Sequence, residues 1–380
     1  MNTAEKLSAL STPELIIDER KMMANIVRMR SRPELAKVSL RPHLKTAKSV
    51  EVALRLISTP KGPGTVSTLK EAEVYFEAGI SDLIYAVGIS PQKLPRVLAL
   101  HRAGCDLKVL LDTPEQAKAL IEASKAHSSP IPALIEIDSD GHRGGLEPGD
   151  PLLIEIGRIL HAGGLLRGVL THAGDSYNAV GREAHAQFAE KERLAAVTTA
   201  QALRSAGLPC PIVSAGSTPT ASAIRSTEGL TEVRAGVYVF FDLVMAGIGV
   251  CKMEDIALSV LTTVIGHQRS RGWILVDAGW MALSRDRGTA RQAVDQGYGL
   301  VCDVDGKAFG DLIVNSVNQE HGILSLRPGS KSSLPELPVG TQLRILPNHA
   351  CATAAQFDSY FVIPENADAP LKTWPRFGGW

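Results

Sequence analysis

The sequence predicts an α/β fold in which a (β/α)8 TIM barrel is followed by a β-rich domain. Between residues 39 and 240, short apolar runs alternate eight times with segments of helical spacing, as in a barrel of eight βα units. No G-x-G-x-x-G motif follows the first run, which disfavours a doubly wound dinucleotide-binding sheet. Beyond residue 246 the pattern changes to strand-like runs separated by Gly, Pro and Asp.

Eight apolar runs are the expected barrel strands. They cover 39–45, 64–68, 82–87, 106–112, 133–138, 166–172, 211–216 and 232–237. The segments between them, such as 69–78 and 183–206, place apolar residues at helical spacing and charged residues on the outer face. We therefore expect the barrel domain to span residues 14–246.

The β-rich domain is expected at residues 247–380. Its strand-like runs are 256–264, 273–277, 310–317, 322–326 and 342–346. Residues 1–13 are expected to join this domain, because Thr12-Pro13-Glu14 forms a natural boundary before the apolar run at 15–17.

Composition excludes several classes of function. The 380 residues contain 40 basic and 40 acidic side chains, so charge implies neither nucleic acid nor an anionic membrane as a partner. No apolar run approaches the ~20 residues of a membrane helix, and the N-terminus lacks the apolar core of a signal peptide. Five scattered cysteines do not form a disulfide framework, which favours a cytoplasmic location.

The candidate site begins with L-R-P-H-L-K-T-A-K-S at 40–49. In a barrel, functional residues lie at the carboxyl ends of the strands, and this segment places His43 and Lys45 there. A lysine at such an end can form an imine with a carbonyl compound, whereas the alternative is an ordinary basic loop. Residues three apart on an extended strand face opposite sides, so at most one of Lys45 and Lys48 can face the barrel mouth.

Other strand ends carry further polar residues. They are Ser67, Thr68, Arg143, His172, Tyr177, Gly216, Ser217, Thr218, Gly236 and Tyr238. The loops after the last two strands of a barrel, with a helix N-terminus, are where phosphate binds, although G-S-T at 216–218 is also an ordinary helix cap. Opposite a lysine on the first strand, a phosphate site indicates a phosphorylated carbonyl cofactor, namely pyridoxal 5'-phosphate (PLP).

A second candidate site lies in the β-rich domain. P-N-H-A-C at 347–351 places His349 and Cys351 two residues apart, where one loop can present both to a divalent metal such as zinc. Two protein ligands leave open positions for substrate or water. The alternative is a buried cysteine beside a hydrogen-bonded histidine. N-Q-E-H at 318–321 adds His321, either near that metal or in a simple turn.

The ordered set of motifs resembles the fold-type III PLP enzymes of the alanine racemase superfamily. The resemblance is to the branch that contains D-threonine aldolases and eukaryotic-type D-serine dehydratases. The matching segments are R-P-H-L-K-T-A-K at 41–48, V-S-T-L-K-E-A-E at 66–73, D-G-H-R-G-G at 140–145, T-H-A-G at 171–174, A-G-S-T-P-T at 215–220, A-G-V-Y at 235–238, Q-E-H-G at 319–322 and P-N-H-A-C at 347–351.

The resemblance implies a role for each candidate residue. Lys45 would hold PLP as an imine. The other cofactor-binding residues would be Thr68, Arg143, His172, Tyr177, Ser217, Thr218, Gly236 and Tyr238, the last four of them around the phosphate. His349 and Cys351 would hold a divalent metal (Zn, Mn, Mg or Co), and His321 would join them and Lys45 in catalysis.

The resemblance also implies a lyase. Aldolases of this branch carry His-x-Asp where the dehydratases carry His-x-Cys, so Cys351 favours a dehydratase. Such an enzyme converts D-β-hydroxy amino acids (D-threo-3-hydroxyaspartate, D-serine, D-threonine) to a 2-keto acid and ammonia, and the family implies homodimers. Retro-aldol cleavage to glycine and an aldehyde is the alternative. A PLP carrier without chemistry would lack the second domain, and a racemase would need a second base on the opposite cofactor face.

Overall fold

The computed structural model describes residues 3–141, 143–366 and 368–380. Contacts between Cα atoms divide the chain into two compact units. The barrel unit comprises Arg28–Gly236 together with Gly379–Trp380. The β unit comprises the N-terminal segment up to Val27 together with Val237–Gly378. Each unit is built around one sheet.

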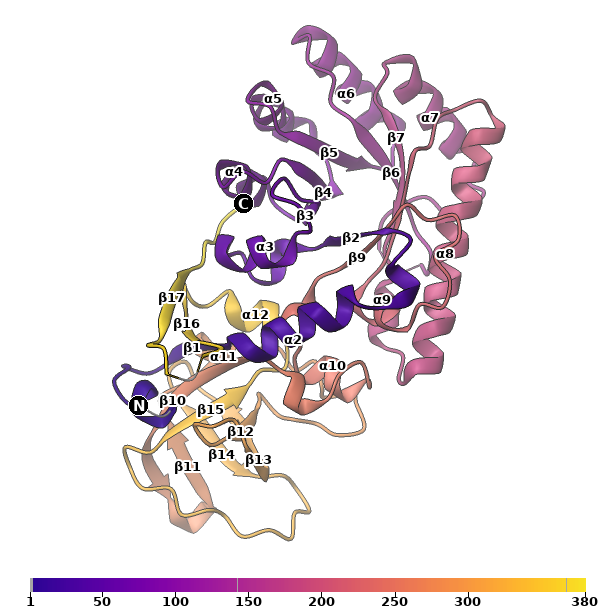
Figure 1. Cartoon of the computed structure of the whole chain (residues 1–380). Coiled ribbons are helices and arrows are strands. Elements are labelled where there is room, and N and C mark those ends of the chain that lie inside the picture. Colours follow the sequence, from indigo (N-terminus) through magenta and orange to yellow (C-terminus); the bar gives the residue numbers. More distant parts are fainter. Residues whose placement is uncertain (1–2, 142, 367) are drawn as a thin grey trace. The chain divides into compact units, whose positions relative to one another are not determined.

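The barrel unit holds eight parallel strands (Figure 1). Their order in the sheet is β2-β9-β8-β7-β6-β5-β4-β3, and an isolated parallel bridge between His43 and Thr65 links the two edges, so the barrel is nearly closed. The strands are β2 (Ser39–Pro42), β3 (Gly64–Val66), β4 (Asp82–Gly88), β5 (Asp106–Leu111), β6 (Ala133–Ile137), β7 (Leu166–Thr171), β8 (Ile212–Ala215) and β9 (Glu232–Ala235). The predicted barrel and its eight strands are confirmed.

Helices connect the barrel strands. They are α3 (Val50–Leu56), α4 (Leu69–Glu77), α5 (Leu94–Arg102), α6 (Pro114–Ala126), α7 (Leu152–Ala162), α8 (Arg182–Ser205) and α9 (Thr218–Ala223). Hydroxyl side chains cap several of them: Thr68 accepts from the first turn of α4, and Thr113 forms a capping box with Gln116 in α6. Such caps bind backbone N–H groups that the helix itself leaves without acceptors.

The barrel interior has an apolar part and a polar part. A buried apolar cluster comes from four neighbouring strands: Ile84, Leu110, Leu134 and Leu170. Alternate residues of a strand face the same side of a sheet, so Ile84 lies on the side of Asp82 and Leu110 on the side of Lys108. Asp82 and Lys108 belong to a polar network that links β2, β4, β5 and β9, described below. This side of the sheet is therefore the interior.

The β unit is a nine-stranded sheet with the order β11-β14-β13-β12-β15-β10-β1-β16-β17. Neighbouring strands pair antiparallel except for β1 and β16. The strands are β1 (Glu14–Asp18), β10 (Leu258–Gln268), β11 (Trp273–Val276), β12 (Leu300–Cys302), β13 (Ala308–Val317), β14 (Gly322–Leu326), β15 (Gln342–Leu346), β16 (Ser359–Ile363) and β17 (Lys372–Pro375). Short helices accompany them: α1 (Thr3–Leu7), α10 (Leu243–Gly247), α11 (Trp280–Leu283) and α12 (Ala350–Ala354), while α2 (Glu19–Arg30) crosses the boundary between the units.

The units differ from the expected domain boundaries in their extent. β1 pairs with β10 and β16, so the N-terminal part of the β unit runs to Val27 instead of 13, and its second part starts at Val237 instead of 247. An apolar run has the same appearance whichever sheet it enters, because its partners are distant in sequence. Within the described residues, no helix combines the length and apolarity that a membrane crossing requires.

Candidate active site

The barrel unit brings its candidate residues to one rim. Each follows the carboxyl end of a parallel strand: His43, Lys45, Ser67, Thr68, Arg143, His172, Tyr177, Ser217, Thr218 and Gly236. Carboxyl ends of parallel strands meet at the same edge of a barrel, where such folds place their active sites. Tyr238 lies in the β unit, buried in the short helix η5 (Val237–Val239), so its place beside a phosphate stays a prediction.

Lys45 and Lys48 have different surroundings. β2 ends at Pro42, and Lys45 lies in a 3-10 turn, η2 (Leu44–Thr46), with its side chain exposed. Lys48 instead points to the buried Glu71, with its Nζ 3.4 Å from Oε1, and its backbone has φ +45°. Lys48 is thus engaged in an ion pair, whereas the described residues provide no such partner for the amine of Lys45.

His43 is a partly buried, neutral side chain that contacts the backbone of Lys45. Its Nδ1 accepts from the backbone N–H of Lys45 (3.5 Å), so the proton is on Nε2, 3.4 Å from the hydroxyl oxygen of Ser67. Burial, together with the charges of Lys45 and Arg234, holds the pKa of His43 well below its ordinary value of 6.5. His43 therefore supports the turn that contains Lys45 and is uncharged at neutral pH.

His172 forms a second neutral ring at the rim. Its Nδ1 donates to the carbonyl of Gly216 (3.1 Å), and its ring centroid lies 6.2 Å from that of Tyr177. Burial first, and the charge of Arg143 second, lower the pKa of His172 to about 3. Arg143 itself is exposed and lies 3.8 Å from Glu136 on β6. An uncharged, oriented imidazole beside a tyrosine can contact the face of a planar ring.

The loop between β8 and α9 contains buried hydroxyl groups. Ser217 caps α9 and forms a capping box with Thr220, while the Thr218 hydroxyl accepts from the N–H of Gly236 (3.2 Å). Gly216 has φ +131°, and a Cβ there would collide with the backbone of Arg234. The rim thus offers an exposed primary amine, a neutral imidazole, and hydroxyl and amide groups, which fit the carbonyl, ring and phosphate of PLP.

Glu192 is a functional candidate that the motifs do not reveal. It lies on α8, is buried, and its oxygens accept from the N–H groups of Ala173 and Gly216 and from the hydroxyl of Thr220. A signal was present in the sequence, because Glu192 falls at helical spacing from the buried Ala189 and Ala196, on the apolar face of α8.

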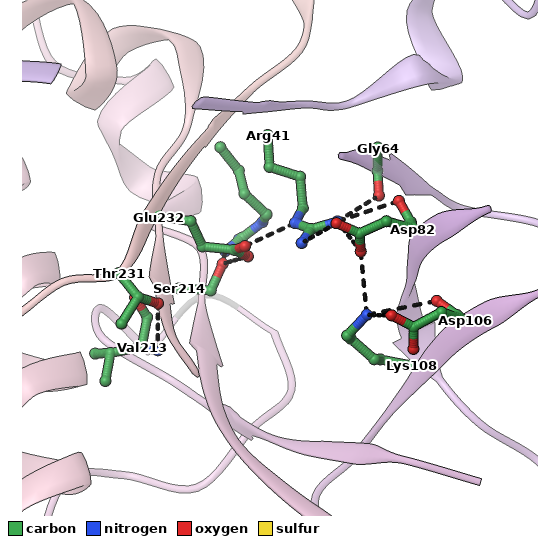
Figure 2. Close-up of polar contacts among 10 residues, drawn as sticks. Arg41, Gly64, Asp82, Asp106, Lys108, Val213, Ser214, Thr231 and Glu232 are labelled. Atoms are coloured by element: carbon green, nitrogen blue, oxygen red, sulfur yellow. Dashed lines mark hydrogen bonds and ion pairs between the residues drawn. The ribbon is translucent and has the colours of Figure 1, made fainter. Parts of the chain in front are cut away.

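Below the rim, a partly buried ionic network links β2, β4, β5 and β9 (Figure 2). Arg41 lies between two carboxylates: its Nε is 2.7 Å from Glu232, and NH1 is 3.0 Å from Asp82. Lys108 extends the network, since its Nζ lies 3.1 Å from Asp82 and 2.7 Å from Asp106. Arg41 belongs to the basic segment 41–48, but it lies within β2, points into the barrel and joins β2 to β4 and β9.

The metal candidates lie at the start of α12 in the β unit, with His349 as its N-cap and Cys351 in its first turn. His349 precedes α12, and its Nδ1 is 2.9 Å from Oδ2 of Asp286. Burial alone would lower the pKa of His349, but hydrogen bonds to Asp286 and Cys351 raise it to about 11. An imidazole oriented by a carboxylate and next to a thiol fits a divalent metal such as zinc. Among the described residues, no cluster of three or more His, Cys, Asp and Glu side chains is placed to hold a metal.

Buried side chains fix the backbone of this segment. Asn348 accepts from the hydroxyl of Thr289 (2.9 Å) and donates to the carbonyl of Gly297 (2.7 Å). Asp242 accepts from the N–H of Ala350 at 3.0 Å. His321 lies apart in sequence, exposed in the turn between β13 and β14, and its catalytic role stays a prediction.

Family comparisons define the class of the chain. Residues 17–244 match the family described as alanine racemase, N-terminal domain, and residues 257–363 match a serine dehydratase domain family. The chain belongs to the alanine racemase-like, fold-type III PLP family.

Three relatives show which members of this family the chain is similar to. D-threo-3-hydroxyaspartate dehydratase from Delftia sp. (strain HT23) is 53% identical, over 99% of this chain and 100% of the relative. Its solved structure has a TM-score of 0.95 at 52% identity, covering 99% of this chain and 100% of that one, and a cysteine-to-alanine variant is known in a metal-free form. D-serine dehydratase from Schizosaccharomyces pombe is 30% identical over 98% and 93% of the two chains. D-threonine aldolase from Filomicrobium marinum is 27% identical, with a TM-score of 0.82 and coverages of 97% and 95%.

Proposed function

We propose that this protein is a PLP- and divalent-metal-dependent dehydratase of D-β-hydroxy amino acids. The observation that carries the proposal is the His349–Cys351 segment, oriented by Asp286, in a chain 53% identical to the Delftia D-threo-3-hydroxyaspartate dehydratase. The products are a 2-keto acid and ammonia.

Each group at the rim has a role in binding or proton transfer. Lys45 would hold PLP covalently, Ser217 and Thr218 would bind its phosphate, and the neutral rings of His172 and Tyr177 would contact its ring. When bound, PLP accepts electron density from Cα, and the metal acts as a Lewis acid toward the β-hydroxyl. Once the substrate amine has taken its place, Nζ of Lys45 removes the Cα proton.

His349 and Cys351 hold the metal. Loss of the Cα proton and of the β-hydroxyl removes one water from the substrate. The resulting enamine tautomerises and takes up one water, which gives the 2-keto acid and ammonia, so atoms balance without an oxidant or reductant. As a strong donor, the thiolate of Cys351 would keep the metal bound to the protein during loss of the β-hydroxyl.

D-threo-3-hydroxyaspartate is the proposed preferred substrate. Its second carboxylate would gain a charge-assisted hydrogen bond from a cation, and the exposed guanidinium of Arg143 at the rim supports this preference. Such a bond changes specificity by about ten- to a hundredfold. The expected order of kcat/KM is therefore D-threo-3-hydroxyaspartate above D-serine and D-threonine.

Product analysis tests the proposal. We expect oxaloacetate and ammonia from D-threo-3-hydroxyaspartate, pyruvate and ammonia from D-serine, and no product from the Lys45→Ala variant. Glycine and glyoxylate as main products would identify an aldolase instead. Equal or faster turnover of D-serine would leave the dehydratase standing and remove the substrate preference.

The proposal also includes a cytoplasmic location and a homodimeric state. Within the described part of the chain, none of the five cysteines forms a disulfide bond, which fits the reducing cytoplasm. A homodimer is proposed from the family resemblance, and light scattering of the purified protein measures its mass. Metal analysis of the same sample identifies the native ion among Zn, Mn, Mg and Co.

A further inference from the structure

Glu192 contacts two rim loops with one carboxylate. Its Oε1 accepts from the N–H of Ala173 and from the N–H of Gly216, each at 2.9 Å. Its Oε2 accepts from the hydroxyl of Thr220 at 2.8 Å. Glu192 is 2% exposed, so water does not compete for these bonds. Burial raises the pKa of Glu192 above its ordinary value of 4.5, while these three hydrogen bonds act to lower it.

The two loops carry the two halves of the proposed cofactor site. One loop begins at His172, whose ring is the proposed contact of the PLP ring, and the other contains Ser217, a proposed phosphate ligand. Two further bonds join them: Nδ1 of His172 donates to the carbonyl of Gly216 (3.1 Å), and the hydroxyl oxygens of Ser176 and Ser217 lie 3.0 Å apart. The spacing between the ring contact and the phosphate contact is therefore built into the protein.

A buried cation supports the same loops from the strands beneath. Arg234 donates to the carbonyl of Thr171 at 2.6 Å and to the hydroxyl of Ser214 at 2.7 Å. These two residues lie near the ends of β7 and β8, directly before the two loops. The charge of Arg234 also acts on Glu192, so the buried carboxylate has a counter-charge.

We propose that Glu192 is a positioning residue for PLP that fixes the distance between the ring-contact loop and the phosphate loop. This inference rests on the proposed function. A ligand that uses two contacts at a fixed spacing gains from both at once, because binding at one loop brings the other group into place. Pyridoxal and inorganic phosphate each use one loop and do not depend on the spacing.

Four variants distinguish the effect of the length of the Glu192 side chain from the effect of its charge. Glu192→Ala removes all acceptors, and Glu192→Asp keeps the carboxyl group but shortens the side chain by one methylene. Glu192→Gln keeps the length and an oxygen that can accept both N–H groups. Glu190→Ala is the matched control, because Glu190 lies on the same helix and pairs with the surface Arg193.

The experiment measures dissociation constants of the apo-proteins for PLP, pyridoxal and inorganic phosphate, together with the thermal midpoint of each variant. Glu192→Ala and Glu192→Asp should bind PLP about ten- to a hundredfold more weakly, with the affinities for pyridoxal and phosphate unchanged. Glu192→Gln and Glu190→Ala should bind all three ligands like the wild type. If Glu192→Ala does not fold, Glu192→Asp provides the comparison.

Three results would show whether the inference about Glu192 or the proposed function is wrong. An equal loss of affinity for all three ligands, with a lower thermal midpoint, would show a structural role only and overturn the inference. Unchanged PLP binding in both the Ala and Asp variants would overturn it as well. A wild-type protein that does not bind PLP at all would contradict the proposed function itself.

Discussion

Asp286 places its Oδ2 2.9 Å from Nδ1 of His349 and thereby fixes which face of the imidazole is presented outward. The same carboxylate accepts from the N–H of Gly288 at 2.7 Å through its other oxygen. A metal-binding histidine whose second nitrogen is held in this way keeps its tautomer and its ring orientation. The pairing is a preformed feature of the β unit.

Replacement of Asp286 should weaken metal binding. Asp286→Ala removes the partner of Nδ1, so we expect about ten- to a hundredfold lower affinity for the divalent metal. Competition with a fluorescent chelator measures the affinity. Asp311→Ala is the control, since Asp311 pairs with Arg327 in another part of the sheet. Equal affinities in the two variants would contradict an orienting role for Asp286.

Removal of the metal should abolish activity without unfolding the protein. A site with two protein ligands contributes less to folding than a closed site with four. After dialysis against a chelator, we expect lost turnover, retained PLP absorbance and a nearly unchanged thermal midpoint. Cooperative unfolding on addition of the chelator would show that the metal is structural.

Lys45, and not Lys48, should carry the cofactor. Lys48 is engaged with Glu71, whereas Lys45 is exposed at the rim. Lys45→Ala should therefore lose the visible absorbance of bound PLP, and Lys48→Ala should keep it. Borohydride reduction followed by peptide mapping locates the modified residue, and label on Lys48 would refute the assignment.

The buried network in the barrel should be sensitive to the loss of its central cation. Arg41→Met leaves the buried Glu232 without its ion-pair partner, so we expect a loss of about 3–5 kcal/mol in the free energy of unfolding of the apo-protein. Urea denaturation measures it. Arg225→Ala, which breaks an exposed pair with Glu183, should leave the midpoint in place. Similar midpoints for both variants would contradict the assigned importance of Arg41.

His172 should make the folded barrel less stable in acid. Its pKa in the folded protein is lowered to about 3 by burial and by Arg143, against an ordinary value of 6.5 when unfolded. Between these pH values the unfolded chain binds a proton that the folded chain does not. Stability should therefore fall as the pH drops from 6.5, by up to about 1.4 kcal/mol per pH unit from this residue. His172→Gln should flatten the dependence of the apo-protein midpoint on pH between 6.5 and 4, and an unchanged slope would count against a neutral His172.

The barrel was predictable because its strands are local features. Each apolar run between 39 and 240 became a parallel strand, and the rim residues follow from the rule that strand ends share one edge. The motif around Ser217 also indicated a capped helix start, which the capping box with Thr220 confirms. Local pattern and tertiary structure agree in these segments.

The remaining features depend on contacts between distant segments. β1 entered the nine-stranded sheet through pairing with residues some 240 or more positions away, which no local pattern encodes. Glu192 acquires its partners at Ala173 and Gly216 only when α8 packs beside β7 and β8. The carboxylate of Asp286 reaches His349 from 63 residues away. Each of these contacts requires the folded chain before it can be recognised.

The isolated bridge between His43 and Thr65 gives the barrel a closure point two residues before the proposed catalytic amine. His43 is also anchored on the other side, since its N–H donates to the carbonyl of Ala235 on β9. The turn that carries Lys45 therefore adopts its final shape only when β2 has met both β9 and β3. In a partly assembled barrel Lys45 would be displaced. The absorbance of bound PLP should therefore appear during refolding when the barrel closes, and not earlier.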